Sequence, residues 1–177
     1  MKPWKWNSSY DEDENLDWLL MRGGPIVKYH STTVLQEHLE ELAKLRYQVI
    51  DLSTSNWTRK NAHQKIKAGF NFPDYYGENI AAFDDCLSDM FSTKYPGLII
   101  VLRNFDAFYS EDKNFADAIL DSISRESWAW LLAGQKLISL VQSKDPHLEI
   151  NKIGGVNPGW NGSEWLDARR IGRKNKT

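Results

Sequence analysis

One uninterrupted apolar run, Leu98–Leu102, constrains the fold of this chain more than any other feature. Its residues are all aliphatic, with no polar side chain at alternate positions. Side chains of a β-strand point alternately to the two faces of a sheet, so this run is typical of a strand covered on both faces. Helices packed on each side of a small sheet provide such cover, which predicts a layered α/β fold.

Segments typical of strands and of helices alternate on both sides of this run. Ile26–Tyr29 and Tyr47–Leu52 are predicted strands, and Lys136–Val141 is predicted to be the last strand of the sheet. Between the first two, Ser31 can cap a helix whose apolar residues recur at helical spacing: Val34, Leu35, Leu39, Leu42 and Leu45. Two strands joined by a helix of this length imply a right-handed βαβ unit and parallel pairing. With further helices over 58–70 and 112–133, the pattern predicts an α/β fold in which a single, small, mainly parallel sheet is flanked by helices.

The segment Pro73–Met90 predicts a turn followed by an amphipathic helix. Pro73 fixes its own φ, Gly77 tolerates backbone conformations that other residues avoid, and Asn79 can cap the helix. One face of this helix is apolar and consists of Ile80, Phe83, Cys86, Leu87, Met90 and Phe91. The other face consists of Ala81, Asp84, Asp85, Ser88 and Asp89, so the helix buries one side and shows an acidic side to water.

Helix formation does not explain the charge of that second face. Between residues 74 and 89 there is no Lys, Arg or His, but there are five carboxylates, those of Asp74, Glu78, Asp84, Asp85 and Asp89. Asp85 and Asp89 repel each other at a spacing of four residues, and Asp89 lies near the negative end of the helix dipole. A solvated polar face is the simplest alternative. The single sign of the charge, two neighbouring tyrosines and a gap of small residues at Ala81 and Ala82 favour a surface that binds a basic partner.

The stretch Tyr75–Leu87 resembles the signature of the barstar family, intracellular protein inhibitors of ribonucleases. The family pattern reads roughly Y-[YF]-G-x-N-[LW]-D-A-L-x-D-C-L, and nearly every specified position matches. Two positions differ, because the usual family Asp is Ala81 here and a position that is often aromatic is Asp84. The negative face is therefore kept, but its charges are redistributed.

The resemblance covers residues 47–142, and we expect the whole chain, 1–177, to form a single barstar-like domain. Residues 1–46 would be an N-terminal extension with an extra strand–helix unit. Residues 143–177 would be a Trp-containing C-terminal extension that ends in a basic tail. Its residues Arg169, Arg170, Arg173, Lys174 and Lys176 are expected to be disordered. In the extensions we also expect a short docked helix at Asp17–Leu20, a turn at Asn157–Gly159, a helix capped by Ser163, and packing of Trp160 and Trp165 onto the body.

The resemblance implies a protein that inhibits a ribonuclease, for self-protection or toxin immunity, by plugging its cationic active cleft with an acidic helix. The partner would be a cognate basic ribonuclease or nuclease toxin, bound by a monomer in a 1:1 complex. Asp85 would be the anchor that lies where the scissile phosphate would be. The expected partner-binding residues are Tyr75, Tyr76, Gly77, Asn79, Ile80, Ala81, Asp84, Asp85, Ser88 and Asp89. The alternative is a non-inhibitory binding module of the same fold for another basic partner, which the change at Ala81 favours.

Composition argues against several other classes of protein. The net charge of −2 gives no broad basic surface, so no direct contact with nucleic acid is expected. A single cysteine, Cys86, and the absence of a membrane-length apolar run or signal peptide favour a cytoplasmic protein with no membrane partner. We expect no enzyme activity and no cofactor. A metal site is not expected either, since the histidines lack metal-ligand spacing. The strongest alternative on the enzyme side is a hard cation held by Asp84, Asp85 and Asp89, which a single helix face would encircle poorly.

Overall fold

The computed structural model describes residues 15–171 of the 177-residue chain. The acidic run at residues 11–14, Trp4, Trp6, Arg173, Lys174 and Lys176 lie outside the described residues. The elements in chain order are α1 (Leu16–Met21), β1 (Ile26–Tyr29), α2 (Thr32–Lys44), β2 (Gln48–Ser53), α3 (Ala62–Phe70), α4 (Ile80–Ser88), β3 (Gly97–Arg103), α5 (Phe105–Glu111), α6 (Lys113–Leu132), β4 (Lys136–Gln142), β5 (Gly159–Trp160) and α7 (Asp167–Arg170).

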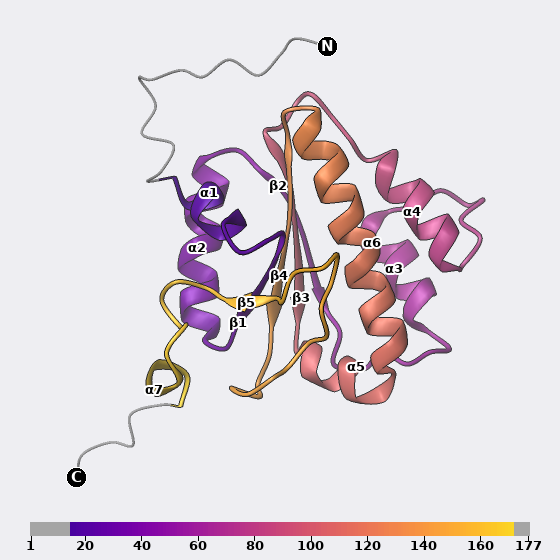
Figure 1. The fold of residues 1–177 in the computed structure, drawn as a ribbon. Helices are drawn as coiled ribbons and strands as arrows, with labels where there is room; N and C mark the ends of the chain where they lie inside the picture. The colour runs from indigo at the N-terminus through magenta and orange to yellow at the C-terminus, as the bar shows by residue number, and fades with distance from the viewer. Residues whose placement is uncertain (1–14, 172–177) are drawn as a thin grey trace.

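The strands form a five-stranded sheet in the order β2-β3-β4-β1-β5, and every neighbouring pair is parallel (Figure 1). The apolar run lies in β3, where Leu98–Leu102 is buried throughout. Its side chains alternate between two separate hydrophobic clusters, so that Leu98, Ile100 and Leu102 join one cluster while Ile99 and Val101 join the other. The prediction of a parallel α/β fold with a doubly covered strand is confirmed.

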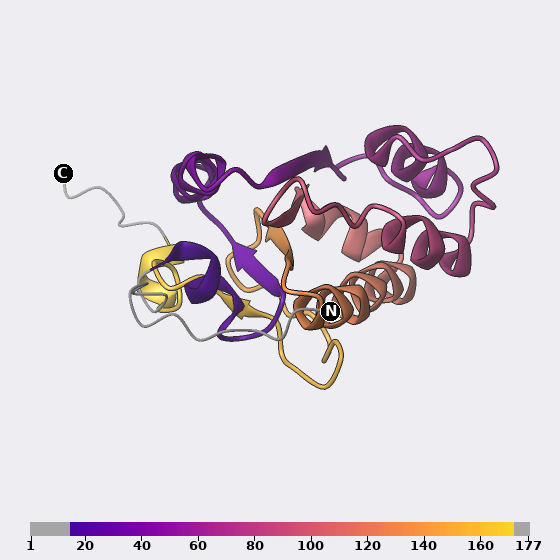
Figure 2. The same cartoon turned by 90° about the horizontal axis from the view of Figure 1, so that it is seen from above.

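Helices cover the two faces of the sheet unequally. The larger cluster contains buried residues of α3, α4, α5 and α6, and the smaller one contains residues of α1 and α2. Figure 2, which views the molecule from above, shows α3, α4 and α6 together on the right and α1 and α2 on the left, on the other side of the sheet. The acidic helix α4 therefore lies far from the part of the sheet that the N-terminal extension covers.

Direct pairing of β1 with β2, which a simple βαβ unit implies, is wrong. Two strands, β3 and β4, lie between them, so the chain crosses most of the sheet after β1. The burial of each strand gives the reason. All four residues of β1 are buried, as in a strand inside a sheet, whereas β2 keeps exposed residues such as Val49, as in a strand at its edge.

The C-terminal extension also differs from expectation. Strand β5 was not predicted, and β4 is not the last strand, because β5 pairs with β1. Outside this extension, helix α5 between β3 and α6 was not predicted either. The turn lies at Gly154 and Gly155, which both have positive φ, and not at 157–159. Ser163 caps no helix, since α7 begins after Leu166.

The short helix predicted at Asp17–Leu20 is confirmed as α1, where the Asp17 carboxylate accepts a hydrogen bond of 2.6 Å from the Tyr47 hydroxyl.

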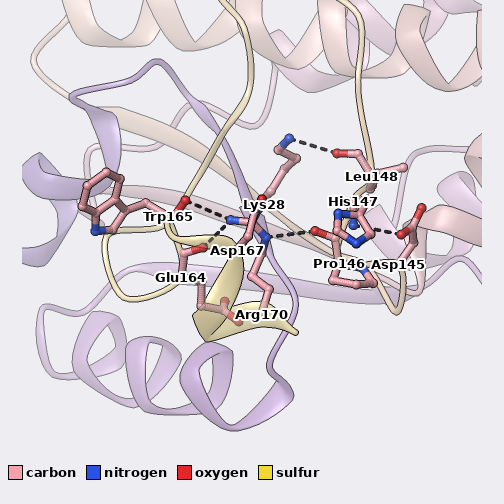
Figure 3. A network of polar contacts seen from close by, with 9 residues as sticks. All are labelled: Lys28, Asp145, Pro146, His147, Leu148, Glu164, Trp165, Asp167 and Arg170. Atoms are coloured by element: carbon pink, nitrogen blue, oxygen red, sulfur yellow. Dashed lines mark hydrogen bonds and ion pairs between the residues drawn. The ribbon is translucent and has the colours of Figure 1, made fainter. Parts of the chain in front are cut away.

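Two buried cations order the C-terminal extension, and one of them, Lys28, joins it to strand β1 of the sheet (Figure 3). Arg170 is 6% exposed, and its guanidinium donates hydrogen bonds to the carbonyl oxygens of Pro146 at 2.9 Å and Glu164 at 2.6 Å. Lys28 of β1 donates to the carbonyl of Leu148 at 3.0 Å. Arg170 is thus part of the fold and not of a disordered tail. Backbone carbonyls bind its charge, and sequence composition cannot reveal them.

The two tryptophans of this extension behave differently. The ring of Trp160 packs against both cations, with Lys28 Nζ 4.7 Å and Arg170 Cζ 4.5 Å from its centroid. Trp165 is 63% exposed, so the prediction that it packs onto the body is wrong. The Glu164 carboxylate completes the attachment, because it accepts hydrogen bonds from the backbone N–H groups of His30 and Ser31 at the start of α2.

Candidate protein-binding surface

The turn before α4 is built by local hydrogen bonds. Asn79 accepts a hydrogen bond from the backbone N–H of Ala82 at 2.9 Å, which confirms it as the helix cap, and its amide donates to the carbonyl of Gly77 at 2.9 Å. The residue with left-handed backbone is Glu78, with φ of 49°, and not Gly77. A Cβ at position 77 would lie 3.2 Å from the Asn79 side-chain nitrogen and 3.4 Å from Ala82, a tight fit that would require the capping side chain to shift by a few tenths of an ångström.

Helix α4 buries most of the face that its apolar spacing predicts, but it ends at Ser88, so Met90 and Phe91 lie beyond it, and Phe91 is 37% exposed. Phe83, Cys86 and Leu87 are buried in the larger hydrophobic cluster, and Met90 packs against that cluster. Burial raises the pKa of the Cys86 thiol, and the nearby carboxylates of Asp89 and Asp85 raise it further. A buried thiol with a raised pKa is a packing residue and a poor nucleophile. The apolar face therefore fixes how far, and at which angle, the acidic face projects.

The structure places the predicted partner-binding residues at different depths. Seven of them are exposed, namely Tyr75, Gly77, Asn79, Ala81, Asp85, Ser88 and Asp89. Ile80 and Asp84 are half-buried, and Tyr76 is only 5% exposed. Tyr75 is the large aromatic residue among the exposed ones, and it is 77% exposed.

Tyr76 supports the turn from inside the molecule. Its hydroxyl lies 2.6 Å from Nδ1 of His63, and its ring packs against Phe72 with 5.1 Å between centroids. Burial raises the pKa of Tyr76 and lowers the pKa of His63, so both groups are held neutral. The adjacent tyrosines thus take opposite orientations, and in this conformation Tyr75 alone presents its ring to a partner.

Ion pairs divide the acidic residues into two groups. Asp84 pairs with Arg125 of α6 at 2.8 Å, and Asp74 pairs with Lys67 of α3 at 3.1 Å. Within residues 15–171, no ion pair involves the other three carboxylates, those of Glu78, Asp85 and Asp89. Residues 74–89 contain no cation, but Lys67 and Arg125 from other helices lie close to two of the carboxylates in space. The negative charge without an ion pair in the described residues is therefore concentrated on Glu78, Asp85 and Asp89.

Helix α6 contributes two residues that the sequence did not single out. Arg125 bonds both Asp84 and Asp121, the residue four positions before it in α6. Glu126 lies beside Ser88 and Asp84. Burial raises the pKa of Glu126 and Asp84 raises it further, while a hydrogen bond from Ser88 acts in the opposite direction. One oxygen of Asp84, Oδ1, is buried and accepts no hydrogen bond from the described residues.

These contacts also give the relative direction of the two helices. Asp84 meets Arg125, and just beyond the end of α4 Phe91 meets Trp130 of α6 edge-on, with 5.5 Å between ring centroids. Residue numbers rise together, so α4 and α6 run side by side in the same direction (Figure 1). No local signal could have paired residues that are 41 positions apart in the sequence.

The part of the chain that the structure describes contains no cluster of three or more His, Cys, Asp or Glu residues able to hold a metal ion. Asp84, Asp85 and Asp89 do not converge as a metal centre would require, because Asp84 turns toward Arg125. Across residues 15–171, no helix combines the length and the apolar character needed to cross a membrane.

Comparison with known proteins identifies the family. A family model described as "Barstar (barnase inhibitor)" matches residues 47–142, more than half of the chain. The Bacillus subtilis (strain 168) protein named "Putative ribonuclease inhibitor YrdF" is 36% identical over 61 residues, which are 34% of this chain and 64% of that relative. The chain thus covers less than two thirds of that relative. The family consists of inhibitors and not of enzymes, and this chain belongs to the barstar family.

Proposed function

We propose that this chain inhibits a basic ribonuclease by inserting the acidic face of α4 into the enzyme's active cleft. The observation that carries the proposal is the position of Asp85, which is exposed on α4 and has no ion pair within the described residues. Its neighbour Asp84 is turned inward and paired with Arg125. Asp85 is therefore one of three exposed carboxylates, with Glu78 and Asp89, whose charge is available to a partner, and the family resemblance makes it the proposed anchor.

The chemistry of a ribonuclease suits such a surface. The enzyme must attract a phosphate backbone, so its cleft carries cationic side chains. Asp85, Asp89 and Glu78 would take the place of phosphate oxygens and accept charge-assisted hydrogen bonds from those cations. Because they have no ion pair in the described residues, binding breaks no internal salt bridge, and only their hydration is lost.

The turn and helix are also pre-organised for binding. The Asn79 cap and the buried residues Phe83 and Leu87 hold α4 in place, so little conformational entropy is lost on association. Tyr75 would add a rigid aromatic contact, and Gly77 and Ala81 would let the partner approach the backbone closely. Asn79, Ile80 and Ser88 would line the contact, with Tyr76 as support and Asp84 as the link to α6.

We further propose that the extensions and the family core form one domain. The support is the pairing of β1 with β4 and of β5 with β1, which continues the sheet of the core outward. The expected site of action is the cytoplasm, where the free thiol of Cys86 stays reduced. There the protein would form a 1:1 complex that protects the cell from its own nuclease or from a toxin.

The second candidate is a binding module for another basic protein, and Ala81 is the observation that favours it. The inhibitor proposal is tested by titrating the purified chain into small basic ribonucleases and following cleavage of a fluorogenic RNA. We expect loss of activity that is complete at one inhibitor per enzyme for at least one ribonuclease of the panel. Tight binding without loss of cleavage would support the binding module instead, and absence of binding to every ribonuclease would contradict the proposal.

A further inference from the structure

A pocket of about 510 Å³ lies in the two extensions, where α1, α2, β1 and the segment around β5 meet. Its apolar lining includes Leu16 and Leu20 of α1, Val27 of β1 and Trp160 of β5. Every residue of the lining lies outside 47–142, the range that matches the family model. In both Figure 1 and Figure 2, α1 and β5 lie on the left and α4 lies on the right, so the pocket is separate from the acidic face.

Two glycines leave this volume unfilled. Gly159 and Gly162 both border the pocket, and a Cβ at either position would meet no atom within 4 Å. Neither glycine has a φ in the left-handed region, so a larger side chain would fit there without backbone strain. Such a side chain would bury more apolar surface and stabilise the fold. Packing therefore does not explain why the space stays open, whereas a bound molecule would.

The walls of the pocket are held in place by contacts with the rest of the molecule. Trp160 packs against Lys28 and Arg170, the two cations of the network in Figure 3. Helix α1 is anchored by the hydrogen bond of 2.6 Å from the Tyr47 hydroxyl to the Asp17 carboxylate. Small-molecule sites are usually pre-formed in this way, with a mostly apolar lining and a few fixed polar groups.

A buried hydrogen bond fixes the position of the proton on His38, a residue of α2 that borders the pocket. Nδ1 of His38 lies 2.8 Å from the hydroxyl of Tyr29, which is 0% exposed. Within residues 15–171 that hydroxyl makes no other hydrogen bond, so as an acceptor it would leave its own proton buried without a partner. Tyr29 therefore donates to Nδ1, and the proton of His38 lies on Nε2. Burial lowers the pKa of His38 by more than the nearby carboxylates raise it, which keeps the ring neutral.

The Nε2–H group of His38 is the donor that the pocket offers. His38 is half-buried, and no described residue accepts a hydrogen bond from Nε2. The amide of Asn161 is already engaged, since it donates to the carbonyl of Lys28 at 3.2 Å and to the carboxylate of Glu164 at 2.6 Å. Arg22 also borders the pocket but takes part in an interaction of its own, and the described lining contains no Asp or Glu. The polar side of the pocket thus suits a neutral acceptor and not an ion.

We propose that this pocket binds a neutral, mainly apolar small molecule with one acceptor oxygen, such as a ketone or an ester. Its apolar body would pack against Leu16, Leu20 and Trp160, and its oxygen would accept a hydrogen bond from Nε2 of His38. Pockets that hold small molecules typically measure about 300–1,000 Å³, a range that includes this one. The activity is independent of ribonuclease inhibition, because the pocket and the acidic face share no residue.

The test uses the full chain and the neutral dye prodan, a naphthalene with one ketone group. Its emission moves to longer wavelength when the ketone accepts a hydrogen bond. We expect one dye molecule per chain and displacement of the dye by 2-octanone. Octanoate, an anion of the same chain length, should displace the dye at least about tenfold less well, because its charge would lose hydration without gaining a counter-charge.

Two variants of the pocket and one control complete the experiment. Gly159→Leu fills the pocket and should weaken dye binding by at least about tenfold. The double variant Tyr29→Phe/His38→Phe removes the donor together with its partner, so no hydroxyl is left unpaired. It should bind the dye about tenfold more weakly, with emission at shorter wavelength. The matched control is Leu132→Ser, which removes an 85% exposed apolar side chain of α6 and should leave the dye affinity unchanged.

Several results would each overturn the proposal. The full chain would bind no dye, or octanoate would displace the dye as well as 2-octanone does. A folded Gly159→Leu variant would bind as the wild type does, or the double variant would bind with unchanged affinity and emission. Loss of binding in Leu132→Ser would show that the dye adsorbs to exposed apolar surface. If one of the two pocket variants does not fold, the other variant and the competition by octanoate decide the outcome.

Discussion

Replacement of Asp85 by alanine separates the binding role of α4 from its role in folding. Asp85 is exposed and has no ion pair within residues 15–171, so its removal breaks no described contact of the folded chain. It also removes one member of the repelling pair with Asp89, and alanine is the strongest helix former. We therefore expect a variant that folds as well as the wild type or slightly better, but that inhibits its target poorly.

The size of both effects follows from these contacts. Like charges four residues apart cost about 0.2–0.5 kcal/mol, and alanine is favoured over aspartate in a helix by up to about 0.7 kcal/mol. Because about 1 kcal/mol changes the Tm of a chain of this length by roughly 2–4 °C, the Tm should rise by no more than about 5 °C. In the complex, loss of Asp85 would leave cations of the partner buried without a counter-charge, at a cost of roughly 2–5 kcal/mol. That cost corresponds to an inhibition constant about 30-fold to several thousand-fold higher, mainly through faster dissociation.

The assay pairs thermal unfolding with inhibition of the ribonuclease identified by the panel. Glu37→Ala is the matched control, because it removes one exposed carboxylate from α2 on the other side of the sheet. Its inhibition constant should change far less than that of Asp85→Ala. Asp84→Ala should lie between them, since Asp84 is already paired with Arg125. A normal Tm with unchanged inhibition by Asp85→Ala would refute the mechanism of an acidic plug.

Four further predictions concern the hydrophobic core, electrostatic steering of the partner, the family position that is Ala81 here, and the dependence of stability on pH. Leu87→Ala should lower the free energy of unfolding by roughly 2–5 kcal/mol, measured by urea unfolding, because Leu87 is 0% exposed. A urea midpoint equal to that of the wild type would show that the wrong face of α4 is assigned as buried. The association rate constant, measured by stopped flow, should fall steeply between about 0.01 and 0.15 M salt as the screening length shrinks; no change would exclude electrostatic steering. Ala81→Asp should lower the inhibition constant for those ribonucleases of the panel that place an Arg or Lys opposite this position. If the order of the inhibition constants across the panel does not change, position 81 makes no contact with the enzyme. Burial lowers the pKa of His63 in the folded chain, so as the pH falls the unfolded chain binds a proton at this histidine before the folded chain does. The free energy of unfolding should therefore be highest above about pH 6.5 and decrease as the pH falls below that value. Urea unfolding at pH 7.5 and 5.5 should show a smaller loss for His63→Gln, and an equal loss would locate the effect elsewhere.

Features that depend on neighbours in sequence were predictable. The aliphatic run in β3, the Ser31 and Asn79 caps and the buried face of α4 follow from side-chain periodicity and from hydrogen bonds that span three residues. The cap at Asn79 also placed the start of the acidic helix correctly. These elements are specified locally, so the sequence contains the information needed to predict them.

Features that depend on distant residues were not predictable in the same way. Tyr75 and Tyr76 look equivalent in sequence. Tyr76 is buried because it contacts His63 and Phe72, whereas Tyr75 is exposed to solvent. The aspartates at 84 and 85 look equally available, but Arg125 neutralises Asp84. Which carboxylates remain for a partner is therefore decided by the packing of α6 against α4.

The sequence by itself determined the α/β class, the acidic helix and its buried face, since alternation, helical spacing and capping act over a few residues. Only the tertiary structure decided the strand order and the role of the extensions. Strand order depends on which edges must be covered, and the buried β1 lies between β4 and β5 for that reason. Arg170 belongs to a basic stretch in the sequence but is buried in the structure, because carbonyl groups from two separate loops converge on its guanidinium.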